Sequence, residues 1–221
     1  NVVYAQMTRG KTERTVAYSI SALATTLMKF AADCCLFMSQ NFGFIELPEE
    51  FTTGSSIMPH KKNPDVFELM RGKCNKLQAI PGELAAITGN LTSGYFRDLQ
   101  LLKEKYIYAF TEIKSCLEIA LLMVPNISIK KGILNNDIYD YLFSVEEVNR
   151  RVLEGVPFRE AYKQVGIEIE NGNFKPNKEV KHTHEGSLGN LCTEQIKNKM
   201  EVNYSKIDST KIDSALHKLL G

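Results

Sequence analysis

The chain has 221 residues, of which 43% are hydrophobic and 24% charged, enough apolar material for one large domain or two small ones. Its 27 basic residues nearly balance its 26 acidic ones, and a net charge of +1 argues against nucleic acid or an anionic membrane as a partner. No run of about 18 apolar residues occurs, which argues against a membrane span.

The chain begins with Asn1, and no charged-then-apolar leader follows, so we expect it to start within a longer protein. Its five cysteines show no CxxC pair and no regular spacing: Cys34, Cys35, Cys74, Cys116 and Cys192. We expect free thiols that pack as small apolar side chains in a reducing cytoplasm.

Three long amphipathic helices are predicted in the first 125 residues, because apolar residues recur there at helical spacing. The first stripe is Val16, Ile20, Leu23, Leu27, Phe30, Cys34 and Phe37. The second is Val66, Leu69, Met70, Cys74, Leu77, Ile80, Leu84 and Ile87, and the third is Leu99, Leu102, Tyr106, Phe110, Ile113, Leu117, Leu121 and Val124. Helices of roughly 25–30 residues are about 40 Å long and need partners along their whole length. They predict a bundle that other chains complete, with a kink in the second helix at Pro81.

After Pro125 the predicted elements become shorter and more polar. We expect helices near residues 135–142, 145–154, 157–170, 193–200 and 209–220, with a polar loop at 171–181. No segment shows a convincing strand pattern. The predicted fold is therefore all-α, with residues 1–126 forming part of a long-helix bundle and residues 127–221 a small helical C-terminal domain.

The loop at residues 41–62 is the predicted site of chemistry. Asn63, Pro64 and Asp65 suit the start of a helix, and Lys61 and Lys62 lie just before it. Lysines beside a helix N-terminus form a site for a carboxylate or phosphate, and a serine in that positive field is easier to ionise. The alternative is a solvated, Ser- and Thr-rich loop that only caps the helix.

The string Gly54-Ser55-Ser56-Ile57-Met58-Pro59-His60-Lys61-Lys62-Asn63 resembles the signature of the fumarase, aspartase and argininosuccinate lyase superfamily. The resemblance implies Ser55 as the base that removes the Cβ proton and Lys61 as the cation that stabilises the resulting carbanion. It implies that Asn63 contacts the departing fumarate carboxylate, while Ser56 and Met58 shape the loop and contact substrate. A proton beside a carboxylate is barely acidic, so its removal requires cations and N–H donors already in position.

Further matches resemble argininosuccinate lyases in particular. They are Asn63-Pro64-Asp65-Val66-Phe67-Glu68-Leu69-Met70-Arg71-Gly72-Lys73, Tyr95-Phe96-Arg97-Asp98-Leu99-Gln100-Leu101-Leu102-Lys103-Glu104 and Val156-Pro157-Phe158-Arg159-Glu160-Ala161-Tyr162. By this resemblance Tyr95, Gln100 and Lys103 bind polar groups of the substrate, and Arg9 is a further candidate contact. Without it, residues 95–103 would be a polar helix start with Leu99 and Leu102 in the core. Two departures stand out: Leu101 and Leu102 replace a usual acidic pair, and His60 replaces a usual Gln.

The resemblance implies a carbon–nitrogen lyase of arginine biosynthesis that splits argininosuccinate into arginine and fumarate by β-elimination. It also implies a cytoplasmic homotetramer with sites shared between subunits, a small-molecule substrate and no cofactor or metal. No histidine of this chain has the Thr-x-His-x-Gln-x-Ala context of the family's proposed acid, so we expect an incomplete C-terminal half that is inactive alone. Alternatives are an adenylosuccinate-type or other fumarate-releasing lyase, or a catalytically silent relative like the family's lens crystallins. His182 and His184 are expected in a surface loop.

Overall fold

The computed structural model describes residues 1–54, 57–58 and 60–220. It is mostly helical, at 67%, and its described part contains eight α-helices, which confirms the all-α fold. The chain divides by contacts into two compact units, Asn1–Ile133 and Leu134–Gly221. The domain boundary near residue 126 stays a prediction.

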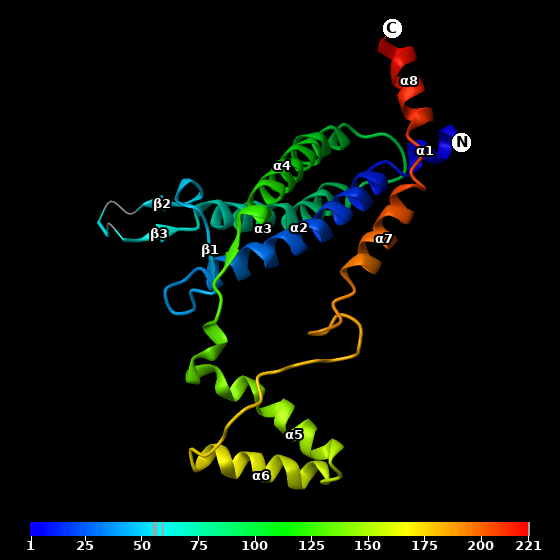
Figure 1. Ribbon diagram of the computed structural model, residues 1–221. Coiled ribbons are helices and arrows are strands. Elements are labelled where there is room, and N and C mark those ends of the chain that lie inside the picture. The colour runs from blue at the N-terminus through cyan, green and yellow to red at the C-terminus, as the bar shows by residue number, and fades with distance from the viewer. Residues whose placement is uncertain (55–56, 59, 221) are drawn as a thin grey trace. The chain divides into compact units, whose positions relative to one another are not determined.

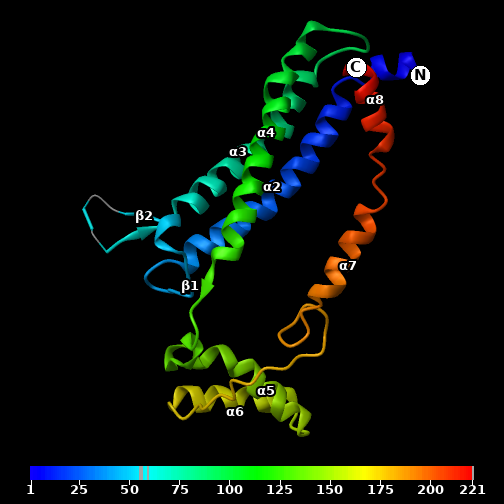
Figure 2. The same ribbon diagram turned by 45° about the horizontal axis from the view of Figure 1, so that its top comes forward.

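The first unit is built around three long helices that lie side by side (Figures 1 and 2). After the short α1 (Val2–Met7) come α2 (Lys11–Phe37), α3 (Asp65–Thr88) and α4 (Leu102–Met123). Pro81 is buried within α3, which continues through it. The three helices match the three apolar stripes of the sequence, because each stripe repeats at the 3.6-residue period of a helix.

The buried face of α2 shares Ile20 and Cys34 with the predicted stripe but also contains three alanines that the stripe did not include. Its buried residues are Ala17, Ile20, Ala24, Ala31 and Cys34. Leu23, which the sequence placed in the seam, is 40% exposed, so that part of the prediction is wrong. Alanine occupies little volume and allows neighbouring helices to approach closely, whereas a leucine at the same place would hold them apart.

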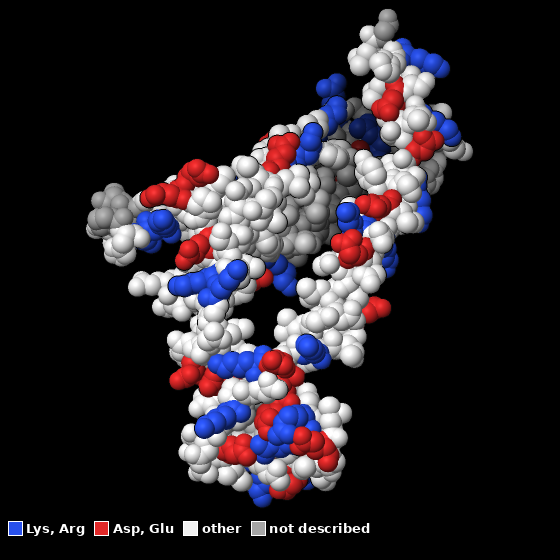
Figure 3. Space-filling view, viewed as in Figure 1, with Lys and Arg blue, Asp and Glu red and all other residues white. Residues whose placement is uncertain are grey.

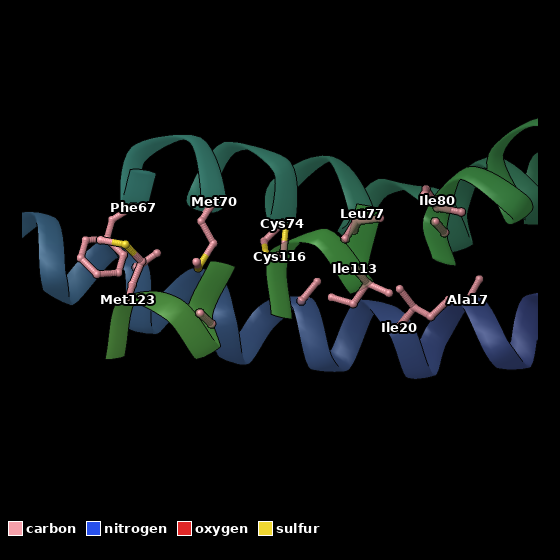
Figure 4. Packing of buried hydrophobic residues seen from close by; sticks show 14 of the residues in the cluster. Ala17, Ile20, Phe67, Met70, Cys74, Leu77, Ile80, Ile113, Cys116 and Met123 are labelled. Carbon is pink, nitrogen blue, oxygen red and sulfur yellow. The ribbon is translucent and has the colours of Figure 1, made fainter. Parts of the chain in front are cut away.

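The core lies between α3 and α4 and against the alanine face of α2 (Figure 4). Phe67, Cys74 and Leu77 on α3 are fully buried, and Cys116 and Met123 on α4 are nearly so. Burial raises the pKa of the Cys74 thiol to about 12, with a further contribution from the neighbouring Cys116. These two cysteines are free thiols, and such a high pKa keeps Cys74 protonated and unreactive.

Part of the predicted core is exposed in this chain. Leu69 on α3 is 65% exposed, and Phe110 and Leu121 on α4 are 41% and 76% exposed. The middle of the bundle also carries few charged side chains on the face in Figure 3. The apolar stripes are wider than three helices can cover, because a helix packs only one face against its neighbours.

Helix α2 is also long and apolar enough, by length and composition alone, to cross a membrane. The sequence had not suggested this, because polar residues interrupt every apolar run. The core helix of a soluble bundle passes the same test, and α2 packs its alanine face against α3 and α4.

Two short strand pairs organise the loops of this unit, although the sequence predicted no strand. β1 (Ile45–Glu46) pairs with β4 (Ser128–Ile129), and β2 (Thr53–Gly54) pairs with β3 (Lys62–Asn63), both antiparallel. Strands of two residues contain too few positions to show an alternating pattern, which is why the sequence did not reveal them.

The second unit contains α5 (Ser144–Leu153), α6 (Phe158–Glu170), α7 (Thr193–Tyr204) and α8 (Thr210–Leu220). The segment expected to be a helix near 135–142 is 3-10 helix at Asp137–Phe143. A small core joins α5 and α6 through Val148, Ala161, Val165 and Phe174. Within the described residues, α7 and α8 bury no side chain.

A network of ion pairs fixes α5 against α6. The Glu147 carboxylate accepts hydrogen bonds from Arg150 Nη2 at 2.6 Å and from Arg151 Nε at 2.9 Å. Arg151 Nη2 also donates to Glu168 on α6 at 2.7 Å. Glu147 is 9% exposed, and its hydrogen bonds to Arg150 lower its pKa from 4.5 to about 2, despite the opposing effect of burial.

This network predicts an acid-sensitive contribution to stability. A carboxyl whose folded-state pKa lies below its unfolded value stabilises the fold above the unfolded pKa and loses that contribution as the pH falls through the folded one. We expect Glu147→Gln to lower the free energy of unfolding by about 1–3 kcal/mol near neutral pH, because Arg150 is partly exposed and solvent screens the pair. The deficit should shrink as the pH falls from about 4.5 toward about 2.

Denaturant titrations followed by circular dichroism at several pH values measure this difference. Glu154→Gln is the matched control, because Glu154 also binds Arg150 but its side chain is 56% exposed. The Glu154→Gln substitution should lower the free energy of unfolding by less than about 0.5 kcal/mol at any pH. If Glu147→Gln lowered the free energy of unfolding by the same amount at every pH, the ionised Glu147 carboxylate would not be the source of the acid-sensitive stability.

Candidate active site

The signature segment forms a β-hairpin that leads into α3. In its register Thr53 faces Asn63 and Gly54 faces Lys62, so Asn63 lies in the second strand and Lys61 directly before it. The Lys61 amide donates to the Met58 carbonyl at 3.1 Å. Ser55 and Ser56, the proposed base and its neighbour, lie outside the described residues.

The hairpin is joined to the first turn of α3. Pro64 precedes the helix, and the Phe67 and Glu68 amides donate to its carbonyl at 2.9 and 3.0 Å. Asp65 and Glu68 place carboxylates in this first turn, where they complement the positive end of the helix. The Thr53 hydroxyl donates across the hairpin to the Asp65 carboxylate. The start of α3 expected from the sequence is therefore the start observed.

Cations gather beside this hairpin in a cleft of about 560 Å³. The cleft is lined by Met38, Gln40, Ile45, Glu46, Leu47, Thr52, Met58, His60, Lys61 and Lys62. His60, Lys61 and Lys62 are exposed and Asn63 is half-buried. Two lysines beside one carboxylate, that of Glu46, make a cleft suited to an anionic group, since ammonium ions attract carboxylates and phosphates.

The second group of candidate residues lies at the other end of α3. Gln100 Nε2 donates to the Tyr95 hydroxyl at 2.9 Å, and the Arg9 guanidinium lies 5.3 Å from the centre of the Tyr95 ring. Lys103 is exposed in the first turn of α4. The structure therefore brings Tyr95, Gln100 and Arg9 together as one patch, which we call the Tyr95 patch. The same segment also buries Leu99 and Leu102 in the core, which confirms the core role expected for these two leucines.

Gly10 explains how Arg9 reaches Tyr95. Its φ of +87° is a conformation that other residues rarely adopt, and a Cβ there would lie only 2.7 Å from the Thr88 side chain. The turn between α1 and α2 therefore lies directly against the end of α3. A larger residue at this position would push that turn away and separate Arg9 from Tyr95.

One chain does not bring the hairpin and the Tyr95 patch together. The hairpin precedes the first residue of α3 and the patch follows its last, and 24 helical residues span about 36 Å. Figure 1 shows the hairpin and the loop between α3 and α4 at opposite ends of the bundle. A substrate of ordinary size bound at the hairpin of one chain is out of reach of the Tyr95 patch of the same chain.

Two histidines of the second unit form a separate arrangement. His182 Nε2 lies 2.9 Å from a Glu146 oxygen, and its ring stacks on that of His184 with centres 5.4 Å apart. Together with α5 they line a cleft of about 710 Å³. Among the described residues, no group of three or more His, Cys, Asp or Glu side chains could hold a metal ion.

Comparison with known proteins finds similarity to lyases. A family model described as "Lyase" matches residues 10–79, which include the hairpin. Argininosuccinate lyase from Parabacteroides distasonis is 58% identical over 220 residues, which are 100% of this chain and 49% of that protein. The chain thus spans about half the length of this curated relative.

Solved structures share the fold at much lower identity. A 3-carboxy-cis,cis-muconate lactonizing enzyme from Pseudomonas putida has a TM-score of 0.61 at 18% identity, over 75% of this chain and 38% of its own. A fumarate lyase:delta crystallin from Brucella melitensis has a TM-score of 0.56 at 19% identity, over 72% of this chain and 35% of its own. Along its whole length the chain is therefore similar to a segment of about half an argininosuccinate lyase, and the matched lyase model includes its signature hairpin.

Proposed function

We propose that the complete protein containing this chain is a cytoplasmic argininosuccinate lyase that releases arginine and fumarate by β-elimination, without a cofactor. The observation that carries the proposal is the signature hairpin, which places Lys61, Lys62 and Asn63 at the N-terminal end of α3. The identity to an argininosuccinate lyase along the whole of this chain supports the substrate.

The residues of the hairpin fit the two demands of this elimination. The first step removes a proton from the carbon beside a carboxylate, and Ser55 is the proposed base. The charge that develops spreads onto that carboxylate, where the exposed ammonium group of Lys61 stabilises it. Asn63 then holds the fumarate carboxylate through its side-chain amide, while Ser56 and Met58 line the loop around the substrate. The carbon–nitrogen bond breaks as the electron pair leaves with the nitrogen.

The rest of the proposed site comes from other chains. Tyr95, Gln100 and Lys103 bind polar groups of the substrate, but they lie about 36 Å from the hairpin of their own chain. Each site therefore takes its hairpin and its Tyr95 patch from different subunits of a homotetramer. The exposed apolar side chains Leu69, Phe110 and Leu121 support this assembly, because burying them against another subunit removes them from water.

Other activities of the same superfamily are the competing interpretations. An adenylosuccinate-type lyase would use the same hairpin with a different pocket for the leaving group. A silent, crystallin-like relative would keep the fold without turnover. The presence of Ser55, Lys61 and Asn63 argues against a silent site.

We predict that the complete protein releases fumarate from argininosuccinate at least about a hundredfold faster than from adenylosuccinate, as judged by kcat/KM. The 221-residue chain alone should show no turnover, because the proposed general acid lies outside it. Ultraviolet absorbance of fumarate measures both. Comparable rates on the two substrates would contradict the substrate assignment, and activity of the isolated chain would show that its own residues supply the acid.

We also predict that Lys61→Met in the complete protein lowers kcat by roughly 10²–10³-fold, the usual effect of removing a preorganised group that stabilises an oxyanion. His60→Gln is the control from the same hairpin, since Gln is usual there in the family, and it should keep kcat within about threefold. If His60→Gln instead lost as much activity as Lys61→Met, His60 would be a catalytic acid or base and the assigned roles would be wrong.

A further inference from the structure

A hydrogen bond across the base of the signature hairpin has no role in the chemistry assigned so far. The Thr53 hydroxyl donates to Oδ2 of Asp65, twelve residues later in the chain. Thr53 belongs to β2 and Asp65 is the first residue of α3, so this bond connects the outgoing strand of the hairpin to the helix.

The register of the hairpin shows what the bond controls. Thr53 faces Asn63, the last residue of β3, and Asp65 follows two residues later as the first residue of α3. The bond therefore joins β2 to the helix that follows β3. With two residue pairs, β2 and β3 form a very short ladder, which by itself is weakly stable. The Thr53–Asp65 bond therefore fixes the orientation of the hairpin relative to α3, which the short ladder leaves loosely held.

We propose that Thr53 and Asp65 are positioning residues for the elimination, which rests on the function proposed above. They hold Lys61 and Asn63 at the orientation to α3 in which both meet the substrate carboxylates. Neither residue needs to touch the substrate, since they act on the backbone of the hairpin. A hydrogen bond to a carboxylate is stronger than one between neutral groups, which suits it to hold a short hairpin.

The charge of Asp65 adds to this arrangement. The carboxylate lies in the first turn of α3, where the positive end of the helix dipole attracts a negative charge. Thr53 then has a fixed, charged acceptor. A purely structural bond would alter the stability of the protein, whereas a positioning bond alters kcat while leaving substrate binding and melting temperature nearly unchanged.

The test uses Thr53→Val and Thr53→Ser in the complete protein. Valine has the shape of threonine without its hydroxyl, and serine keeps the hydroxyl. Thr53→Val should lower kcat on argininosuccinate by roughly three- to thirtyfold with KM within about twofold, as expected for losing one hydrogen bond to a charged group. Thr53→Ser should restore kcat to within about threefold of the parent protein.

Thr210→Val is the matched control, because the Thr210 hydroxyl also donates to an aspartate, Asp208, but in the second unit. It should leave kcat within about twofold. A double-mutant cycle then tests the pair itself: Asp65→Asn should lower kcat in the parent protein but add little in the Thr53→Val background.

The outcomes separate this proposal from the proposed function. If the complete parent protein did not turn over argininosuccinate, both the proposed function and the positioning role would be contradicted. An active parent with an equally active Thr53→Val variant would overturn the positioning role alone. Additive effects of Thr53→Val and Asp65→Asn, or a loss that follows a fall in melting temperature, would also overturn it.

Discussion

The length of one rigid helix is the constraint on which the rest of this structure depends. α3 begins at the signature hairpin and ends just before the Tyr95 patch, and its 24 residues hold the two about 36 Å apart. Neither group is a complete site by itself: the hairpin offers cations and an amide, and the patch offers a phenol, an amide and a guanidinium. Under the proposed function, a helix of this length therefore requires that each site combine groups from different chains.

The packing of the bundle determines which apolar side chains stay on its surface. Because the face of α2 toward its own chain is made of small residues, the three helices approach closely and leave larger apolar side chains such as Leu23 and Leu69 at the outside. A monomer with such side chains at its surface exposes apolar area that water disfavours.

Sequence reasoning predicted the long helices well, because helical periodicity sustained over many turns is a strong local signal. It did not identify which apolar flank of α2 faces inward, since Leu23 and Ala24 are both apolar and only packing volume distinguishes them. The two-residue strands and the 3-10 segment Asp137–Phe143 are too short for any periodicity to appear. The candidate residues came from resemblance to a family signature. The pairing of Thr53 with Asp65 and of Arg9 with Tyr95 depends on the register and chain turns that bring distant residues together.

Complementation between two variants tests most directly whether the hairpin and the Tyr95 patch of one chain serve different sites. Complete proteins carrying Lys61→Met or Tyr95→Ala should each be nearly inactive as pure assemblies. After the two are unfolded together and reassembled, about a quarter of the sites should combine an intact hairpin with an intact patch, as random mixing of subunits requires. The account predicts recovery of activity toward that fraction. If mixed assemblies form and no activity returns, each site takes both groups from a single chain, and the account is contradicted.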